Sequence, residues 1–190
     1  MQLLNKRFII KSLIVLLFLI GQGSFCLAQT KTYEIDVEKS TIAFKISHLG
    51  ILMVVGNFHN FSGSFTISNN NLQSIESEIS VGSIDTKDKS RDKILVDEAY
   101  LDMNKHPTFS FYSTKINNTL KSKLIIGMLK IKDVEKEISM PFKLLKDGNS
   151  FYIKISTILS RKEFKLDFGG MNSLIGDVIK VELEVINSFN

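Results

Sequence analysis

Three side chains in this sequence have the chemistry to bind the polar end of a ligand: His48, Arg91 and Arg161. An imidazole titrates near neutral pH and can hydrogen-bond a head group. A guanidinium matches phosphate or carboxylate through its planar fork of N–H donors. Each residue also has a structural interpretation, as a hydrogen-bonded or ion-paired anchor, and we prefer that interpretation for all three. The other interpretation makes them head-group contacts for an amphiphilic ligand.

The residues needed for metal or nucleophilic chemistry are poorly represented. His48, His59 and His106 lie on different segments, and no pair of them has the short spacing of metal ligands. The sequence contains no G-x-S-x-G motif and no glycine-rich phosphate loop, and its one cysteine is Cys26. We therefore predict no metal, no cofactor and no catalytic residue.

The N-terminus has the organisation of a secretory signal peptide. A basic stretch is followed by an apolar run over residues 13–20, shorter than the roughly 20 residues of a membrane span. Small residues then lead to a cleavage site between Ala28 and Gln29. We predict a signal peptide over residues 1–28 and an exported domain, periplasmic or secreted, over residues 29–190. An uncleaved anchor and a lipoprotein attached through Cys26 are the alternatives.

Removal of the signal peptide changes the charge of the chain. It holds three of the 24 basic residues and none of the 20 acidic ones, so the remaining domain carries 21 basic against 20 acidic residues. This near balance argues against nucleic-acid binding. The domain also contains no thiol, which excludes disulfides and thiolate chemistry.

After residue 32 the dominant pattern is alternation of apolar and polar residues, which is typical of β-strands. Residues 40–65 contain two strands separated by a corner at His48-Leu49-Gly50. Residues 85–106 lack alternation, and we predict a crossover there with one or two short helices. The other predicted strands cover residues 33–37, 74–83, 108–116, 124–131, 134–145, 151–160 and 178–186. About eight short antiparallel strands favour a closed barrel or a sandwich.

The apolar faces of these strands are rich in phenylalanine. The chain has 14 phenylalanines and no tryptophan, which gives large rings without polar atoms to satisfy. One interpretation is a solid core, and the other is a tunnel for an acyl or isoprenoid chain, in which each buried CH₂ contributes about 0.8 kcal/mol. The predicted tunnel wall consists of Ile42, Phe44, Ile46, Phe58, Phe61, Phe65, Ile79, Phe109, Phe111, Leu129, Phe142 and Ile155.

Short motifs spread over residues 33–186 resemble the YceI-like family. They are Ser40-Thr-Ile-Ala-Phe44, Ser47-His48-Leu49-Gly50, Gly56-Asn-Phe58, Phe61-Ser62-Gly63, Ser83-Ile84-Asp85-Thr86, Arg91-Asp92, Pro107-Thr-Phe109-Ser-Phe111, Gly127-Met-Leu129, Arg161 with Phe164, and Gly176-Asp177-Val178. Each motif is weak alone, but their order and spacing are specific. Ile94, Lys130 and Lys165 depart from the residues usual in the family.

This resemblance implies an all-β, lipocalin-like antiparallel barrel that is exported and binds a long isoprenoid or other lipid. The expected ligand is a polyisoprenoid, an isoprenoid quinone or a fatty-acid derivative, bound without covalent attachment. The resemblance also allows a homodimer. It equally allows a transient contact with a membrane or with a membrane partner. The alternatives are an enzyme using His48, Asp85 or Arg91 at the tunnel mouth, and a filled barrel whose outer face recognises a partner.

Overall fold

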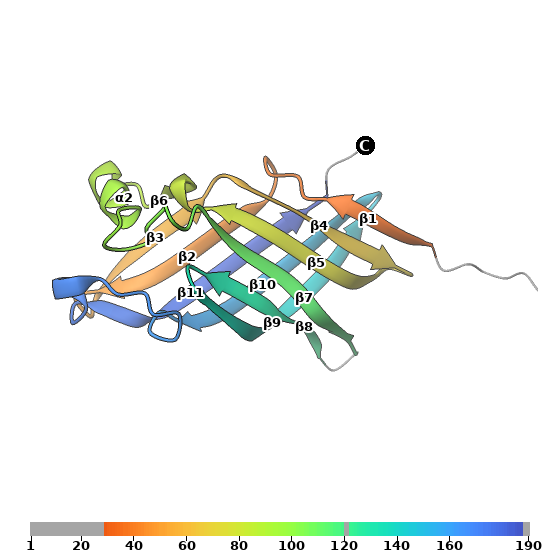
Figure 1. Cartoon of the computed structure of the whole chain (residues 1–190). Helices are drawn as coiled ribbons and strands as arrows, with labels where there is room; N and C mark the ends of the chain where they lie inside the picture. Colours follow the sequence, from red (N-terminus) through yellow and green to blue (C-terminus); the bar gives the residue numbers. More distant parts are fainter. Residues whose placement is uncertain (1–28, 120–121, 188–190) are drawn as a thin grey trace, which may run out of the picture.

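The structure of the protein is a computed structural model that describes residues 29–119 and 122–187 (Figure 1). The predicted signal peptide, residues 1–28, lies outside the described residues. The strands are β1 (Thr30–Glu34), β2 (Thr41–His48), β3 (Leu52–Phe58), β4 (Phe61–Ser68), β5 (Asn71–Ser80), β6 (Ile84–Asp85), β7 (Thr108–Asn118), β8 (Lys123–Ile131), β9 (Val134–Asp147), β10 (Ser150–Ser160) and β11 (Ile175–Ile186). The helical elements are α2 (Lys89–Leu95) and the 3-10 helices η1 (Val81–Ser83) and η2 (Gly169–Met171).

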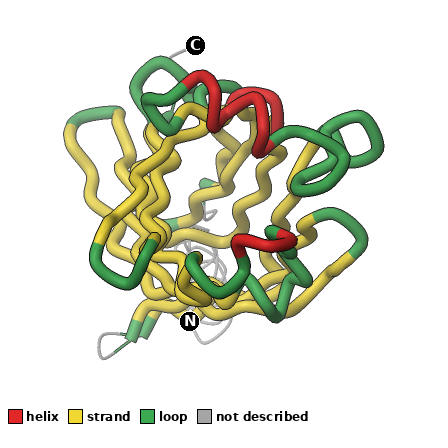
Figure 2. The backbone as a smooth tube through the Cα atoms, turned by 90° about the vertical axis from the view of Figure 1, so that its left-hand side faces the viewer, coloured by secondary structure: helices red, strands yellow, loops and turns green. Residues whose placement is uncertain are grey.

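All of these strands belong to one antiparallel sheet with the order β1-β4-β5-β7-β8-β9-β10-β11-β2-β3-β6. The sheet curls on itself, and Figure 2, which looks onto one end, shows the strands surrounding the interior. The segment after β1 contacts the end of β11, which brings the β1 edge of the sheet back against its other half. Ile35 forms a bridge with Asn187, and the Asp36 N–H donates to the Ile186 carbonyl at 2.8 Å. The structure confirms the predicted lipocalin-like antiparallel barrel.

The described part of the chain has more strands than the expected number of about eight. The stretch after the His48-Leu49-Gly50 corner contains two strands, β3 and β4, because the chain reverses at His59-Asn60. This reversal is held by the His59 N–H, which donates to the Ser83 carbonyl at 3.2 Å, and by the Asn60 carbonyl, which accepts from the Ser80 N–H at 2.9 Å. The two-residue β6, which alternation could not reveal, adds another strand beside β3.

The crossover between β6 and β7 contains the helix α2, as predicted from the sequence. The Asp88 carboxylate begins this helix by accepting from the backbone N–H groups of Ser90 and Arg91 at 3.0 and 3.1 Å, an N-cap that satisfies otherwise unpaired donors. The crossover ends at Pro107, and β7 starts at the next residue, since a residue before proline favours extended backbone. Within the described ranges no helix is long and apolar enough to span a membrane.

Candidate functional site

The interior of the barrel contains a cavity of about 490 Å³. This volume lies within the roughly 300–1,000 Å³ of small-molecule sites. Its walls are almost entirely apolar, and they include ten of the twelve residues predicted for the tunnel wall: Ile42, Phe44, Ile46, Phe58, Phe61, Ile79, Phe109, Phe111, Leu129 and Ile155. The structure therefore brings most of the predicted wall together around one space.

Register between neighbouring strands explains why these side chains share the interior. Successive residues of a strand point to opposite faces, whereas residues directly opposite on paired strands point to the same face. Ile42 of β2 lies opposite Leu183 of β11 on one side and Phe58 of β3 on the other. All three side chains line the cavity.

Gly56 makes room for one of the cavity's aromatic rings. It lies opposite Phe44 in the ladder between β2 and β3, and a Cβ atom placed on it would be 2.6 Å from Cε1 of the Phe44 ring. Gly127 does the same for Phe111, whose Cζ would be 2.5 Å from an added Cβ. The two glycines let the phenylalanine rings lie against the sheet, as aromatic side chains do over strand glycines.

We expect Gly56→Ala to displace the Phe44 ring and to lower both stability and ligand retention. Crowding a packed site costs about 1–3 kcal/mol, more than the small gain from replacing a strand glycine. Urea denaturation measures the change. Gly170→Ala is the control, because an added Cβ there meets nothing within 4 Å, and it should change stability by about 0.5 kcal/mol or less. Equal effects of the two substitutions would contradict this account.

Two residues of the predicted wall, Phe65 and Phe142, do not line the cavity. Both are buried in the hydrophobic core. Phe65 stacks on Tyr33 with ring centroids 5.6 Å apart, and Tyr33 also contacts the Phe151 ring at 5.3 Å. Their placement in the wall was therefore wrong, and around Phe65 the barrel is filled by aromatic side chains. The interior is a solid core in one part and a cavity in the other.

Four polar residues line the cavity at the end of the barrel that carries α2 and the end of β2. His48, Asp88, Ser90 and Arg91 all line the cavity there. His48 is half-buried at the last position of β2. We call this end of the barrel the mouth, and Figure 2 faces it.

Arg91 has a structural role at the mouth, as preferred from the sequence. Its Nε and one terminal nitrogen donate to the Thr86 hydroxyl and carbonyl, both at 2.8 Å. The Asp92 carboxylate accepts from the Thr86 N–H at 2.9 Å and from its hydroxyl at 2.6 Å. Both side chains thereby attach α2 to the end of β6. Arg91 nevertheless borders the cavity, so its contact with a head group stays a prediction.

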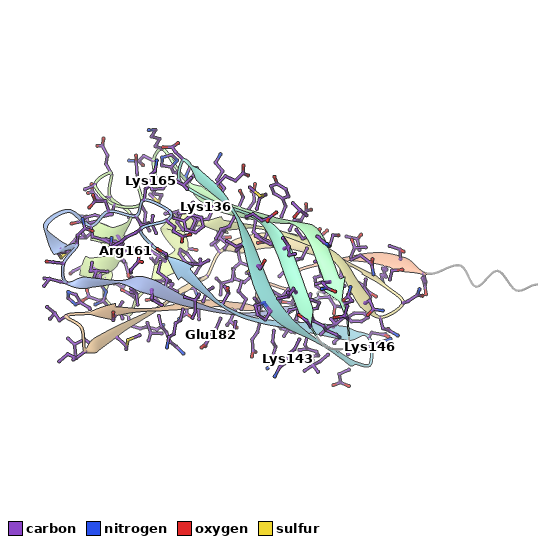
Figure 3. All side chains as sticks on the ribbon, turned by 90° about the horizontal axis from the view of Figure 1, so that it is seen from below. Lys136, Lys143, Lys146, Arg161, Lys165 and Glu182 are labelled. Carbon is purple, nitrogen blue, oxygen red and sulfur yellow. The ribbon has the colours of Figure 1, made fainter. Side chains whose placement is uncertain are left out.

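Arg161 is not part of the cavity, and the placement of this residue at a head-group site was wrong. Arg161 is only 3% exposed, and its N–H groups donate to oxygen atoms of the loop after β10 and of the first two residues of β11. The acceptors are the carbonyls of Leu166, Asn172, Ile175 and Gly176 and the side-chain oxygen of Asn172, at 2.8 to 3.2 Å. A guanidinium has five N–H groups, so these five bonds leave none for a ligand. Figure 3 shows Arg161 and Lys165 toward the mouth end of the barrel.

Asp85 is held in its ionised form outside the cavity. The Lys87 ammonium, the Lys87 N–H and the His59 ring bind its carboxylate at 2.9, 2.8 and 3.1 Å and together hold its pKa far below the usual range. A carboxylate with so low a pKa is a poor general acid and a weak general base near neutral pH. This geometry gives no support to an acid–base role for Asp85.

Apart from Arg91, sequence reasoning missed the cavity residues contributed by the crossover and by the loop after β10. Among them are Tyr100 and Phe168, whose ring centroids lie 5.8 Å apart. The available signal was an apolar cluster at Ile94, Leu95, Tyr100 and Leu101 in an otherwise charged segment. Among the residues with described positions, no group of three or more His, Cys, Asp or Glu is arranged to hold a metal ion.

An antiparallel barrel around one apolar cavity defines a lipocalin-like protein. The YceI-like domain matches residues 33–186, and the chain belongs to this family. A UPF0312 protein of Pseudomonas paraeruginosa is 33% identical over 178 residues, covering 87% of this chain and 91% of the relative. A UPF0312 protein of Yersinia pestis is 32% identical, covering 77% of this chain and 76% of the relative.

Solved structures share the fold at low sequence identity. BcnA of Burkholderia cenocepacia has a TM-score of 0.76 at 19% identity, covering 81% of this chain and 99% of that one. The YCEI protein of Campylobacter jejuni has a TM-score of 0.67 at 22% identity, covering 77% and 91%. A polyisoprenoid binding domain from Saccharophagus degradans, implicated in plant cell wall breakdown, has a TM-score of 0.67 at 14% identity, covering 83% and 98%.

Proposed function

We propose that this protein is an exported lipid-binding protein that carries or sequesters one amphiphilic long-chain lipid in its barrel. The observation that carries the proposal is a cavity with apolar walls and with its charged side chains, Asp88 and Arg91, at the mouth. Such a site matches a ligand with a long apolar chain and a polar end. Ligands of this kind are a polyisoprenoid, an isoprenoid quinone and a fatty-acid derivative.

The energetics favour a long chain over a small polar ligand. Burying ten methylene groups contributes about 8 kcal/mol before the costs of ordering the chain. The wall offers few hydrogen-bonding groups, so the length and shape of the cavity select the ligand. A structural neighbour described as a polyisoprenoid binding domain agrees with this ligand class. The signal-peptide pattern of residues 1–28 supports an extracytoplasmic location.

Native mass spectrometry of the gently purified protein tests the proposal. We expect a population heavier than the polypeptide by the mass of one lipid, and organic extraction should remove this mass and permit its identification. Binding stabilises the folded state by mass action, so the extracted protein should unfold at lower temperature and recover when the lipid is returned. A protein that carries no lipid and gains no stability from any long-chain lipid would contradict the proposal.

A further inference from the structure

Large aliphatic side chains at the mouth are exposed to solvent. Ile51 is 85% exposed and Leu52 is 55% exposed, although both are among the most apolar residues of the chain. When a monomeric protein exposes several large apolar residues next to one another, the surface they form marks an interaction site. We call this surface the mouth rim, and it consists of Leu49, Ile51, Leu52, Met171 and Leu174.

The mouth rim is built from two segments that lie side by side. The Leu49 N–H donates to the Leu174 carbonyl at 2.7 Å, and His48 is the ladder partner of Ile175. These contacts hold the corner between β2 and β3 beside the loop after η2, at the same end of the barrel in Figure 1. Met171 and Ile175 also line the cavity. The apolar outer surface therefore continues into the apolar interior.

The backbone at the corner directs the rim outward. Leu49 has a φ of +54° and Gly50 a φ of +74°, a left-handed conformation that leucine rarely adopts. A Cβ atom on Gly50 would meet nothing within 4 Å, so the corner projects into open space. The chain thus places a leucine where asparagine or glycine is favoured.

The β2–β3 corner of the rim carries no charge, and the charges of the loop that supplies Met171 and Leu174 are balanced. Between Lys45 and Glu76 the sequence contains no lysine, arginine, aspartate or glutamate. The loop over residues 161–177 carries three basic and three acidic residues. A protein partner selected by charge would find little to bind here, whereas an uncharged aliphatic projection fits the interface of a zwitterionic bilayer.

We propose that the mouth rim inserts into the surface of a phospholipid bilayer, so that the cavity opens directly onto the acyl chains. This rests on the proposed function, because a lipid carrier must exchange its ligand with a membrane. A chain that leaves a bilayer through water exposes every methylene group, at about 0.8 kcal/mol each. Contact between the rim and the bilayer gives the chain an apolar path and removes most of this barrier.

Flotation with phosphatidylcholine vesicles tests this proposal on residues 29–190, the chain without its predicted signal peptide, which includes every described strand. We expect the protein to float with the vesicles and the floating fraction to resist added salt, because screening weakens only charge-based binding. Leu52→Asp should lower vesicle affinity about tenfold or more. Leu145→Asp is the matched control, since Leu145 is 53% exposed and lies between Lys143 and Lys146, toward the other end of the barrel in Figure 3.

A tryptophan reporter locates the contact. The chain has no tryptophan, so Ile51→Trp gives an emission signal from the rim alone. We expect that emission to shift to shorter wavelength with vesicles and to be quenched by brominated lipid, whereas Leu145→Trp should show neither change.

Uptake of a fluorescent fatty acid delivered from ethanol, without vesicles, separates this proposal from the proposed function. Intact uptake with no flotation overturns membrane docking alone, as does equal loss of flotation in Leu52→Asp and Leu145→Asp. If the parent protein is a dimer that does not float, and Leu52→Asp converts it to a monomer, membrane docking is overturned. The rim then binds a second copy of the chain instead. Intact flotation without uptake overturns the proposed function and supports docking.

Discussion

Thr157→Trp should abolish lipid retention and leave the barrel folded. Thr157 lies between Ile155 and Leu159 on the inward face of β10, and all three side chains line the cavity. An indole at this position fills space that the ligand needs. Loss of two methylene contacts already costs about 1.6 kcal/mol, more than a tenfold change in affinity. We therefore expect at least a tenfold loss of retained lipid by native mass spectrometry.

The adjacent residue supplies a control for this substitution. Ile158 points outward and is 64% exposed, so Ile158→Trp adds the same ring without entering the cavity. We expect Ile158→Trp to retain lipid at the parental level and its emission to be quenched by acrylamide, whereas the emission of the Thr157→Trp protein should be shielded. After lipid extraction, the unfolding midpoints of both variants should stay close to that of the extracted parent, so that lost stabilisation by lipid does not enter the comparison. Normal lipid retention by a folded Thr157→Trp protein would show that the ligand binds elsewhere.

The faces of the strands could be predicted from the sequence because alternation has a period of two. Ile42, Phe44 and Ile46 share a face with His48 in any regular strand, and the structure places all four on the cavity. Alternation does not give depth along the barrel, however. Phe65 and Phe142 have the correct face, but both are buried in the core outside the cavity lining. For Phe65, the ring packing with Tyr33 shows why.

The mouth was harder to predict because it is made from segments without periodicity. The crossover with α2 and the loop over residues 161–177 reach the cavity through contacts between residues far apart in sequence, such as the Tyr100–Phe168 ring pair. Arg161 illustrates the same limit. The sequence shows an arginine suited to an anionic head group, whereas its five bonds to the loop depend on how residues 166–176 fold around it.

Arg161→Met should destabilise the protein strongly, by about 3 kcal/mol or more. Methionine preserves much of the side-chain volume but leaves the carbonyls of Leu166, Asn172 and Ile175 without their donor. Bonds to charged groups contribute about 1.5–3 kcal/mol each, and buried acceptors left unpaired add a further cost. The loss should reach the core, because Phe164 and Leu166 of the same loop are buried in it. Urea denaturation gives the free energy of unfolding, and hydrogen exchange should locate the first loss of protection in residues 161–177.

Two further variants separate the role of the guanidinium from that of charge. Lys162→Ala removes an exposed positive charge from the neighbouring position, and we expect it to change stability by about 0.5 kcal/mol or less. Arg161→Lys keeps the charge but offers three N–H donors from a single nitrogen, so it should recover only part of the loss. Because Leu166 and Phe168 line the cavity, lipid retention should follow the same order, from Lys162→Ala through Arg161→Lys to Arg161→Met. Full recovery by lysine would mean that charge rather than the planar fork holds the loop, and parental stability of Arg161→Met would contradict the role assigned to this residue.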